Sequence, residues 1–431
     1  MTKPGPKTRV AFLTLGCKAN QYDSYAIMAG LDPERFEVLE SEGTPVRADL
    51  YVINTCAVTG RSDFQSRQLV RRARKWNPAA RILVTGCVAE TQPEALEKLP
   101  QDAVIGVSGR EQVLQWIING RGDRPVAPTG EFFFHPAGGR QNRTRALVKI
   151  QDGCDLACAY CIVPRARGRS RSLEEEAVIT QLRRLHEQGF QEAVLTGIHL
   201  GFYGKDRGTS LGALLQRLES ESGLPPRLRL SSLDPQELTP ELVRIMAGSK
   251  RICRHLHLPL QSGDDATLRR MRRSYSSDEV RAVVSILYAN LPDLCLGLDV
   301  IAGFPGETEA QFNATVKCLE SLPWSYLHVF PFSARPGTEA AGMKEQIAPP
   351  VLKARASQLR QQSARRKRAF YAGALGRRLR LLVEETRAGW QRGFSDHYVP
   401  LRFQSETNWE GRLVEVRVQG VDSQGGWGEL A

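Results

Sequence analysis

Three cysteines, Cys154, Cys158 and Cys161, lie close together in the spacing C-x3-C-x2-C, and Tyr160 stands directly before the last of them. Thiolates are soft ligands, and three of them in one short loop can hold one side of an iron–sulfur cluster. A structural zinc site would need a closed fourth position, and this loop offers no fourth cysteine and no histidine. The loop is also polar and flanked by glycine, which argues against the alternative that these are three cysteines packed in a hydrophobic core. The spacing therefore predicts a cluster with one open iron, to which a small chelating molecule can bind.

A second set of cysteines, Cys17, Cys56 and Cys87, follows three apolar, β-rich runs directly. These runs are residues 9–16, 49–55 and 81–86, and helical patterns such as 65–76 lie between them. Strands that alternate with helices predict a parallel sheet. Because the carboxyl ends of parallel strands meet at one edge, we expect the three cysteines to converge there. Chance can place one cysteine at a strand end, but three of them predict a second three-ligand site with an open iron.

A further run of alternating strands and helices begins at residue 144 and positions the loop that contains Cys154. Its six βα units predict a partial (β/α)6 barrel, fewer than the eight strands of a closed barrel. The predicted strands are 146–150, 192–196, 228–232, 255–260, 296–301 and 326–331. The predicted helices are 173–188, 211–220, 240–248, 264–272, 277–289 and 309–321. Chemistry is then expected at the carboxyl ends of the strands, where the cysteine loop begins.

Positive charge is concentrated just before a β-rich tail. The net charge is +12, and residues 351–380 contain ten lysines and arginines and no acidic residue. Strands predicted at 377–384, 398–403, 412–421 and 427–430 suggest a small barrel, a fold that commonly binds nucleic acid. A basic run is usually a solvated face, but one this one-sided favours contact with phosphates. The cations expected to bind RNA are Arg365, Arg366, Lys367, Arg368, Arg377 and Arg378.

The whole chain is therefore predicted to be an α/β protein of three domains. These are an N-terminal parallel-sheet domain at 1–135, a partial barrel at 143–372 and a small β-barrel at 373–431. Residues 120–143, dominated by Pro, Gly and Arg, are interpreted as a linker. The aromatic cluster at 132–134 is interpreted as pinning that linker to a neighbouring domain.

The composition excludes several classes of protein. Of the 431 residues, 41% are hydrophobic and 25% are charged, which excludes a disordered, collagen-like or coiled-coil chain. No run approaches the ~18 apolar residues of a membrane span, and no signal peptide is recognised, so we expect a cytoplasmic protein with no membrane partner. The nine cysteines are an odd number, which argues against a disulfide framework. Cys253, Cys295 and Cys318 share no spacing and are interpreted as small core residues.

The cysteine loop after the first barrel strand resembles that of the radical S-adenosylmethionine (SAM) superfamily. The resemblance implies that Cys154, Cys158 and Cys161 hold a [4Fe–4S] cluster and that SAM chelates its open iron. It implies further that one electron from the reduced cluster cleaves SAM to methionine and a 5′-deoxyadenosyl radical. An electron donor such as flavodoxin or ferredoxin is then expected as a partner. Tyr160 occupies the aromatic position that usually lies near the adenine.

Nearly the whole chain resembles the methylthiotransferase family of that superfamily. The matching stretches are TLGCKANQYDS, INTCAVT, TGCVAE, GCDLACAYCIVPRARGRSRS, HLPLQSGDDATLRRMRR and GFPGET. The resemblance implies a C-terminal TRAM-like barrel and a second [4Fe–4S] cluster, which is held by Cys17, Cys56 and Cys87 and carries the sulfur. Two SAM molecules are then used, one as methyl donor and one as radical source. The sulfur is inserted at an unreactive carbon and delivered methylated.

Other candidate residues depend more strongly on this resemblance. It places Gly197, Gln261, Gly303 and Gly306, all at predicted strand ends, in the SAM pocket, although such glycine turns alone would be ordinary βα turns. Four arginines follow the cysteine loop, and they could grip RNA phosphates or the carboxylate of SAM, or simply face water. They are Arg165, Arg167, Arg169 and Arg171. The histidines near strand ends, His199, His255 and His257, are interpreted as structural hydrogen-bonding residues.

Three groups of the family act on different substrates, and local sequence favours one of them. The stretch TLGCKANQYDS and residues 196–200 resemble the group that acts on N6-threonylcarbamoyladenosine (t6A). That resemblance implies methylthio transfer to C2 of t6A at position 37, in the anticodon loop of ANN-decoding tRNAs. The alternatives are isopentenyladenosine in tRNA and an aspartate of a ribosomal protein. A non-catalytic iron–sulfur protein that binds RNA is a rival of another class, but pure binding needs no open iron.

Overall fold

The computed structural model describes residues 6–40, 44–120, 132–136, 141 and 143–431. The chain separates into two compact units. The first comprises Met1–Gln141, Lys149–Ala177 and Ser333–Ala341, and the second comprises Asn142–Val148, Val178–Phe332 and Gly342–Ala431. The three predicted domain boundaries stay a prediction, and most of the predicted linker lies outside the described residues. The loop that contains Cys154 belongs to the same unit as the N-terminal sheet.

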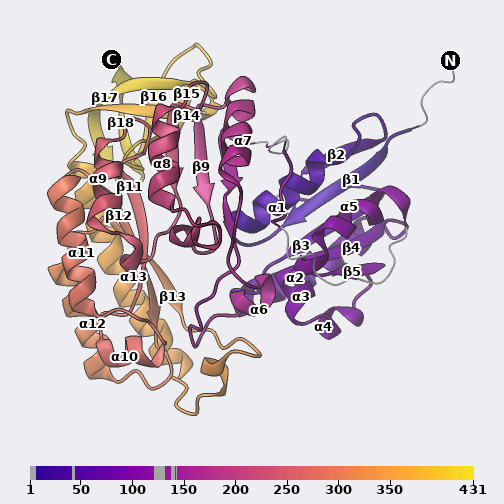
Figure 1. Cartoon of the computed structure of the whole chain (residues 1–431), viewed down its shortest axis with the longest axis horizontal. Helices are drawn as coiled ribbons and strands as arrows, with labels where there is room; N and C mark the ends of the chain where they lie inside the picture. The colour runs from indigo at the N-terminus through magenta and orange to yellow at the C-terminus, as the bar shows by residue number, and fades with distance from the viewer. Residues whose placement is uncertain (1–5, 41–43, 121–131, 137–140, 142) are drawn as a thin grey trace. The chain divides into compact units, whose positions relative to one another are not determined.

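The first unit is built on a five-stranded sheet in the order β2-β1-β3-β4-β5, drawn in indigo and purple in Figure 1. Every pair of neighbouring strands is parallel. The strands are β1 (Thr8–Thr14), β2 (Phe36–Glu40), β3 (Leu50–Thr55), β4 (Arg81–Gly86) and β5 (Ala103–Ile105). All residues of β3 are buried, as expected for a central parallel strand that is covered on both faces. The predicted parallel sheet is confirmed.

Helices connect these strands and begin close to the strand ends. They are α1 (Lys18–Ala29), α2 (Gly60–Trp76), α3 (Cys87–Thr91), α4 (Glu94–Glu97) and α5 (Arg110–Asn119), with the short 3-10 helix η1 (Val107–Gly109). The same unit contains β7 (Gln151–Asp152), α6 (Val163–Arg167) and β8 (Arg171–Ser172). Ile162 and Ala166 lie in one hydrophobic core with Ile53, Val84 and Val88. This packing attaches the cysteine loop to the N-terminal sheet.

The second unit contains the remaining parallel strands in two three-stranded sheets, β10-β9-β6 and β11-β12-β13. The first sheet consists of β6 (Arg145–Lys149), β9 (Glu192–Thr196) and β10 (Arg227–Leu230). The second consists of β11 (His255–Gln261), β12 (Cys295–Ala302) and β13 (Tyr326–Pro331). A single parallel bridge between Leu228 and Ile252 continues the pairing after β10. Six strands alternate with helices, so the predicted partial barrel is confirmed.

Most helices of this α/β region start at a residue whose side chain accepts a hydrogen bond from the backbone of the first turn. The helices are α7 (Glu175–Glu187), α8 (Leu211–Ser220), α9 (Pro240–Gly248), α10 (Asp265–Arg270), α11 (Ser277–Asn290), α12 (Glu309–Ser321) and α13 (Pro349–Ala372). The 3-10 helices of this region are η2 (Leu200–Phe202), η3 (Lys205–Arg207) and η4 (Pro235–Glu237), whereas η5 (Glu339–Gly342) lies mostly in the first unit. Thr308 and Gln311 form a capping box at the start of α12, as Ser276 and Glu279 do at α11. These caps explain why the predicted helix bounds 211–220, 240–248 and 309–321 agree with the structure.

The C-terminal strands close into a five-stranded barrel in the order β14-β15-β16-β18-β17, drawn in orange and yellow in Figure 1. They are β14 (Arg378–Arg387), β15 (Trp390–Ser395), β16 (Pro400–Gln404), β17 (Leu413–Asp422) and β18 (Gly425–Leu430). The predicted small barrel is confirmed. In the described part of the chain, no helix has the length and apolar character that spanning a bilayer requires.

Candidate functional site

The three N-terminal cysteines lie at the carboxyl ends of three neighbouring strands. Cys17 follows β1 and precedes α1, Cys56 follows β3, and Cys87 is the first residue of α3 after β4. Because β1, β3 and β4 are adjacent in the sheet, their carboxyl ends share one edge. Cys17 is exposed, whereas Cys56 and Cys87 are buried. The structure therefore brings this set together, as the positions of the predicted strands indicated.

Gly16 and Asn20 determine how closely the carboxyl ends of β1, β3 and β4 approach one another. A Cβ atom on Gly16, whose φ is +99°, would lie 2.7 Å from Sγ of Cys56, so only glycine allows β1 and Cys56 to approach so closely. Asn20 Nδ2 donates to the carbonyls of Leu15 at 3.0 Å and Thr55 at 2.8 Å. Sγ of Cys87 lies 3.7 Å from Oδ1 of Asn20. One amide side chain thus ties all three strand ends.

Burial makes the thiolate forms of two cysteines costly. It raises the pKa of the Cys56 thiol, and it raises the pKa of the Cys87 thiol to about 12. The positive charge of Arg167 acts in the opposite direction on the pKa of both thiols. Because thiolates are the metal-binding form of cysteine, a fixed cation beside them assists coordination at this edge.

The second cysteine set lines a cavity of about 490 Å³ in the first unit. Cys154, Cys158 and Cys161 are half-buried, and the backbone N–H of Leu156 lies 3.4 Å from Sγ of Cys154, where it can donate to a thiolate. The cavity is lined by Cys154, Asp155, Leu156, Ala157, Cys158, Ala159, Cys161, Pro164, Gly168, Arg169, Gly337, Thr338 and Glu339. Tyr160 is half-buried but does not line this cavity. The predicted position of Tyr160 beside the adenine therefore stays a prediction.

The loop that carries these cysteines is held closed by its own backbone. The Cys154 N–H donates to the carbonyl of Gly168 at 3.0 Å, and the Cys161 N–H donates to that of Cys158 at 3.0 Å. Gly153 has φ +76°, and a Cβ there would lie 1.9 Å from the carbonyl oxygen of Arg169. The chain therefore needs glycine directly before the first cysteine.

Replacement of Gly153 by alanine should disorganise this loop while leaving the N-terminal cysteines in place. The added methyl group must displace the Arg169 backbone, so we expect the Gly153→Ala protein to lose the iron bound by Cys154, Cys158 and Cys161. Iron analysis of the reconstituted protein tests this, with Gly168→Ala as control. Gly168 also has positive φ, but its Cβ would meet nothing within 4 Å. Equal iron loss in both variants would mean that backbone strain, not the close contact, decides the result.

A cluster of five buried charges, Asp23, Asp152, Arg110, Lys149 and Arg167, lies within the first unit beside these elements. Arg167 donates to Asp152 and Asp23 at 2.9 Å each, and also to Oδ1 of Asn20. Lys149 lies 2.6 Å from Asp23 and 3.0 Å from Asp152. Arg110 Nη1 lies 2.8 Å and 2.9 Å from the same two carboxylates. Three cations thus surround two carboxylates, which leaves a net positive charge.

Both carboxylates in this cluster are held ionised. Burial alone would raise the pKa of Asp152, but the charges of Lys149, Arg167 and Arg110 outweigh it and lower that pKa well below its ordinary value. The pKa of Asp23 is lowered by the same three cations. Arg167 lies on α6, a few residues after Cys161, and its charge acts on Cys17, Cys56 and Cys87. Its charge therefore acts on the N-terminal set from the helix that follows the second cysteine set.

Of the alternatives for these arginines, exposure to water is wrong for Arg167. It is buried because its charge is paired with Asp23 and Asp152. Arg165 is exposed and donates to the carbonyl of Gly337, and Arg169 is 92% exposed, so it remains available. Arg171 donates to the carbonyl of Arg167.

The aromatic cluster at 132–134 covers the same buried charges. Lys149 Nζ lies 5.1 Å from the ring centre of Phe132 and 5.8 Å from that of Phe133. The guanidinium of Arg110 lies 5.2 Å from the Phe133 ring. This cation–π packing attaches the segment to the first unit, as interpreted from the sequence.

The residues assigned to the SAM pocket outside the cysteine loop all belong to the second unit. Gly197 follows β9, Gln261 ends β11 with φ +64°, and Gly303 follows β12. The N–H of Gly303 donates to Glu307 at 2.8 Å, and that of Gly306 donates to the carbonyl of Glu345 at 2.8 Å. They lie at strand ends as expected, and their contact with SAM stays a prediction.

The six predicted RNA-binding cations differ in whether their side chains contact other residues of the protein. Arg366 donates to the carbonyl of Glu320 and covers the Trp324 ring, Lys367 lies over Tyr371, and Arg377 pairs with Asp293. The side chains of Arg365, Arg368 and Arg378 are exposed, and among the described residues these side chains make no hydrogen bond or ion pair. Arg355 of the same basic run is buried against Glu307.

The structural interpretations of His199, His255 and the remaining cysteines are confirmed. His199 is buried beside Glu237, and His255 Nε2 lies 2.8 Å from the Tyr326 hydroxyl. His257 Nε2 lies 2.6 Å from Asp299. Cys253, Cys295 and Cys318 are each buried.

Both cysteine sets offer three thiolates, the soft ligands that hold iron–sulfur clusters. The cavity beside Cys154 also falls in the usual range of ~300–1,000 Å³ for a small-molecule site. The residues present therefore fit clusters with room for a chelating ligand.

Comparisons with known proteins agree with this geometry. Residues 148–319 match the Radical SAM superfamily, and residues 9–106 match the Uncharacterized protein family UPF0004. The threonylcarbamoyladenosine tRNA methylthiotransferase MtaB of Bacillus subtilis is 38% identical, over 95% of this chain and 93% of that protein. A tRNA-2-methylthio-N(6)-dimethylallyladenosine synthase of Symbiobacterium thermophilum is 31% identical, over 96% and 92%.

A solved structure supports the fold alone. The radical SAM methyltransferase TsrM from Kitasatospora setae, with cobalamin and a [4Fe–4S] cluster bound, is similar with a TM-score of 0.58 and 16% identity. The similarity covers 90% of this chain and 81% of TsrM. Enzymes of the matched family use SAM and [4Fe–4S] clusters. From its two matched domains and its near full-length relatives, this chain belongs to the MtaB-type group of the radical SAM tRNA methylthiotransferase family.

Proposed function

We propose that this enzyme transfers a methylthio group to C2 of t6A at position 37 of tRNA, using two SAM molecules and two [4Fe–4S] clusters. The observation that carries the proposal is the presence of two separate three-cysteine sets in one compact unit. A single set would support SAM cleavage alone. The second set supplies the place for a sulfur carrier, and relatives named for t6A support the nucleoside.

In this proposal each side chain has a binding or positioning role. Cys154, Cys158 and Cys161 hold one cluster, while Cys17, Cys56 and Cys87 hold the other. When bound, the first cluster supplies the electron that cleaves SAM, and such radical chemistry belongs to the cofactor. The chain supplies the cavity beside Cys154, and Arg167 supplies a fixed positive charge beside the N-terminal thiolates.

The remaining assignments are proposed on the same basis. Gly197, Gln261, Gly303, Gly306 and Tyr160 contact SAM. The tRNA partner presents an ANN-decoding anticodon loop, and flavodoxin or ferredoxin supplies electrons in the cytoplasm.

Nucleoside analysis of cells that lack the gene tests the substrate. Mass spectrometry of digested tRNA should show that 2-methylthio-t6A disappears and t6A persists, and a plasmid copy should restore the product. A Cys154→Ala copy is the matched control and should not restore it. Loss of the methylthio group from isopentenyladenosine instead would assign the enzyme to the other tRNA group, and unchanged tRNA nucleosides would favour a protein substrate.

Charge reversal on α13 should weaken tRNA binding without affecting the clusters. We expect Arg365→Glu with Arg368→Glu to reduce affinity and to flatten the salt dependence of binding by about 0.9 per lost phosphate contact. Arg184→Glu with Arg269→Glu is a control of equal charge, because both side chains are exposed elsewhere in the second unit. Binding in a salt series measures the slopes. Equal slopes in the two variants would show that α13 does not hold RNA.

Surface variants are preferable to deletion of the C-terminal barrel. The guanidinium of Arg227 is buried and lies 3.0 Å from Asp396 of that barrel, and Arg229 donates to the carbonyl of Ser395 at 3.2 Å. Removal of the barrel would therefore uncover buried charges on β10 and change more than RNA affinity.

A further inference from the structure

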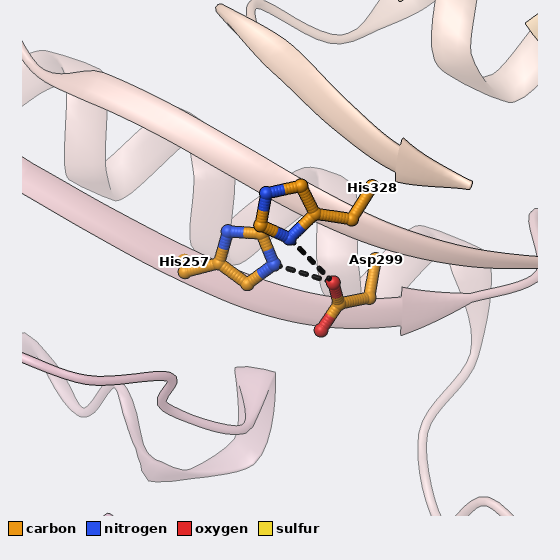
Figure 2. A group of neighbouring side chains, drawn as sticks. All are labelled: His257, Asp299 and His328. Carbon is orange, nitrogen blue, oxygen red and sulfur yellow. Dashed lines mark hydrogen bonds and ion pairs between the residues drawn. The ribbon is translucent and has the colours of Figure 1, made fainter. Parts of the chain in front are cut away.

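Three side chains on neighbouring strands of the second unit converge on one point. His257 lies on β11, Asp299 on β12 and His328 on β13, and Figure 2 shows both imidazole rings directed at the carboxylate. His257 Nε2 lies 2.6 Å and His328 Nδ1 lies 3.3 Å from the same oxygen, Oδ1 of Asp299. One donor atom from each residue lies within 4.8 Å of the other two. None of these residues has a role in the proposed reaction.

The types of these residues are those of a transition-metal site. Imidazole suits zinc, iron, nickel and copper, and two histidines with one carboxylate form the set found in open non-haem sites. Three protein ligands also leave a coordination position for water, as in catalytic rather than structural zinc sites. His328 is 55% exposed, whereas His257 and Asp299 are 8% and 20% exposed, so solvent reaches the group from one side.

A second layer of contacts holds the most buried ligand in position. Nδ1 of His257, the nitrogen that faces away from Asp299, lies 3.3 Å from the hydroxyl of Tyr326. The same hydroxyl lies 2.8 Å from Nε2 of His255. Metal-binding histidines usually donate their second N–H to such a partner, which fixes the tautomer and the ring orientation. A hydroxyl can donate or accept, so Tyr326 can serve His257 with or without an ion.

A metal-free alternative exists, in which both imidazoles simply donate to one carboxylate oxygen. Because a carboxylate oxygen can accept two hydrogen bonds, the variants described below are needed to separate that alternative from metal coordination.

From this convergence the geometry points to a binding site for one divalent transition-metal ion at His257, Asp299 and His328, separate from both cysteine sets. The ligands and the outer shell of this site all lie in the second unit, whereas both cysteine sets belong to the first. The site can therefore bind a metal ion whether or not the proposed function is correct. Zn²⁺ is the suitable probe, since it accepts two nitrogens and one oxygen and undergoes no redox reaction.

Zinc binding to the iron-loaded enzyme tests this site. The protein is equilibrated with zinc and desalted, and both metals are measured by mass spectrometry. We expect one zinc per chain with no loss of iron. Zinc bound at the expense of iron would place it at the cysteines and overturn the proposal, and so would the absence of bound zinc.

Variants then separate coordination from simple hydrogen bonding. His328→Ala removes a ligand that is largely exposed, so the fold should survive, and zinc affinity should fall at least tenfold. Tyr326→Phe leaves all three ligands in place and should weaken binding about 10–100-fold through the outer shell. His186→Ala, on α7, is the histidine-matched control and should bind zinc normally. Unchanged zinc affinity in the His328 and Tyr326 variants would overturn the proposal, whatever their activity. Iron content serves as the check on folding.

Discussion

A variant in which Cys17, Cys56 and Cys87 are all alanine is expected to lose methylthio transfer completely while it still cleaves SAM. The three thiolates meet at one edge of the N-terminal sheet, whereas SAM cleavage depends on the loop at Cys154. Iron should fall from about eight atoms per chain to about four, since one of two [4Fe–4S] clusters is lost. Release of 5′-deoxyadenosine and formation of the methylthio nucleoside are measured in the same reaction.

The reciprocal variant is the matched control for this experiment. Alanine at Cys154, Cys158 and Cys161 removes the same number of thiols from the same compact unit. It should also retain about four irons, but it should neither cleave SAM nor form product. Normal methylthio transfer by the N-terminal variant would contradict the assignment of Cys17, Cys56 and Cys87 as the site of the sulfur carrier.

Replacement of Arg167 by methionine is expected to destabilise the first unit by about 3–5 kcal/mol, the usual cost of removing one partner from a buried ion pair. Asp23 and Asp152 would each lose a charged donor at 2.9 Å. The variant should also bind less iron at the N-terminal cysteines, because its cation no longer opposes the effect of burial on Cys56 and Cys87. Hydrogen exchange of peptides from each unit measures the stability of the two separately.

Arg169→Met provides a control from the same loop. Its side chain is 92% exposed and lies 3.5 Å from Asp155, so its ion pair contributes little to stability. Peptides from the second unit should exchange as in the wild type in both variants. Equal protection of the first unit in the Arg167 and Arg169 variants would contradict a structural role for the buried charges.

Much of the fold could be predicted because local patterns agreed with the tertiary structure. Buried parallel strands such as β3 are continuous apolar runs, and each N-terminal cysteine follows one directly. The partial barrel repeats the same pattern, and its helices begin at capping residues such as Thr308. For the same reason, convergence of the strand-end cysteines could be expected before any coordinates were known.

Four strands were missed: β7 and β8 contain only two residues each, and β2 and β15 have sequences that carry weak signals. β2 is a short strand at the edge of its sheet, with polar residues between apolar ones. β15 contains Gly393, which weakens a strand pattern. In the structure this glycine is required, because a Cβ there would lie 1.8 Å from the carbonyl oxygen of Leu382 on β14.

The buried charge cluster could not be predicted, since its members come from distant parts of the chain. Asp23 meets Arg110, Lys149 and Arg167 only after the N-terminal sheet and the cysteine loop have folded into one unit. Asp23 and Asn20 lie one helical turn apart after Cys17, and Asp152 lies two residues before Cys154. The only sequence signal of the charge cluster was the presence of these polar residues close to the cysteines. That signal did not identify the cations with which the two aspartates pair.

The most direct test of the account is the reaction of the purified, reconstituted enzyme with defined RNA. Anticodon stem-loops with t6A or isopentenyladenosine at position 37, together with SAM and a reductant, are digested after reaction and analysed by mass spectrometry. We expect 2-methylthio-t6A from the first RNA, with 5′-deoxyadenosine as coproduct, and no product from the second. Methylthiolation of the isopentenyladenosine RNA alone, or of neither RNA while SAM is cleaved, would contradict the proposed function.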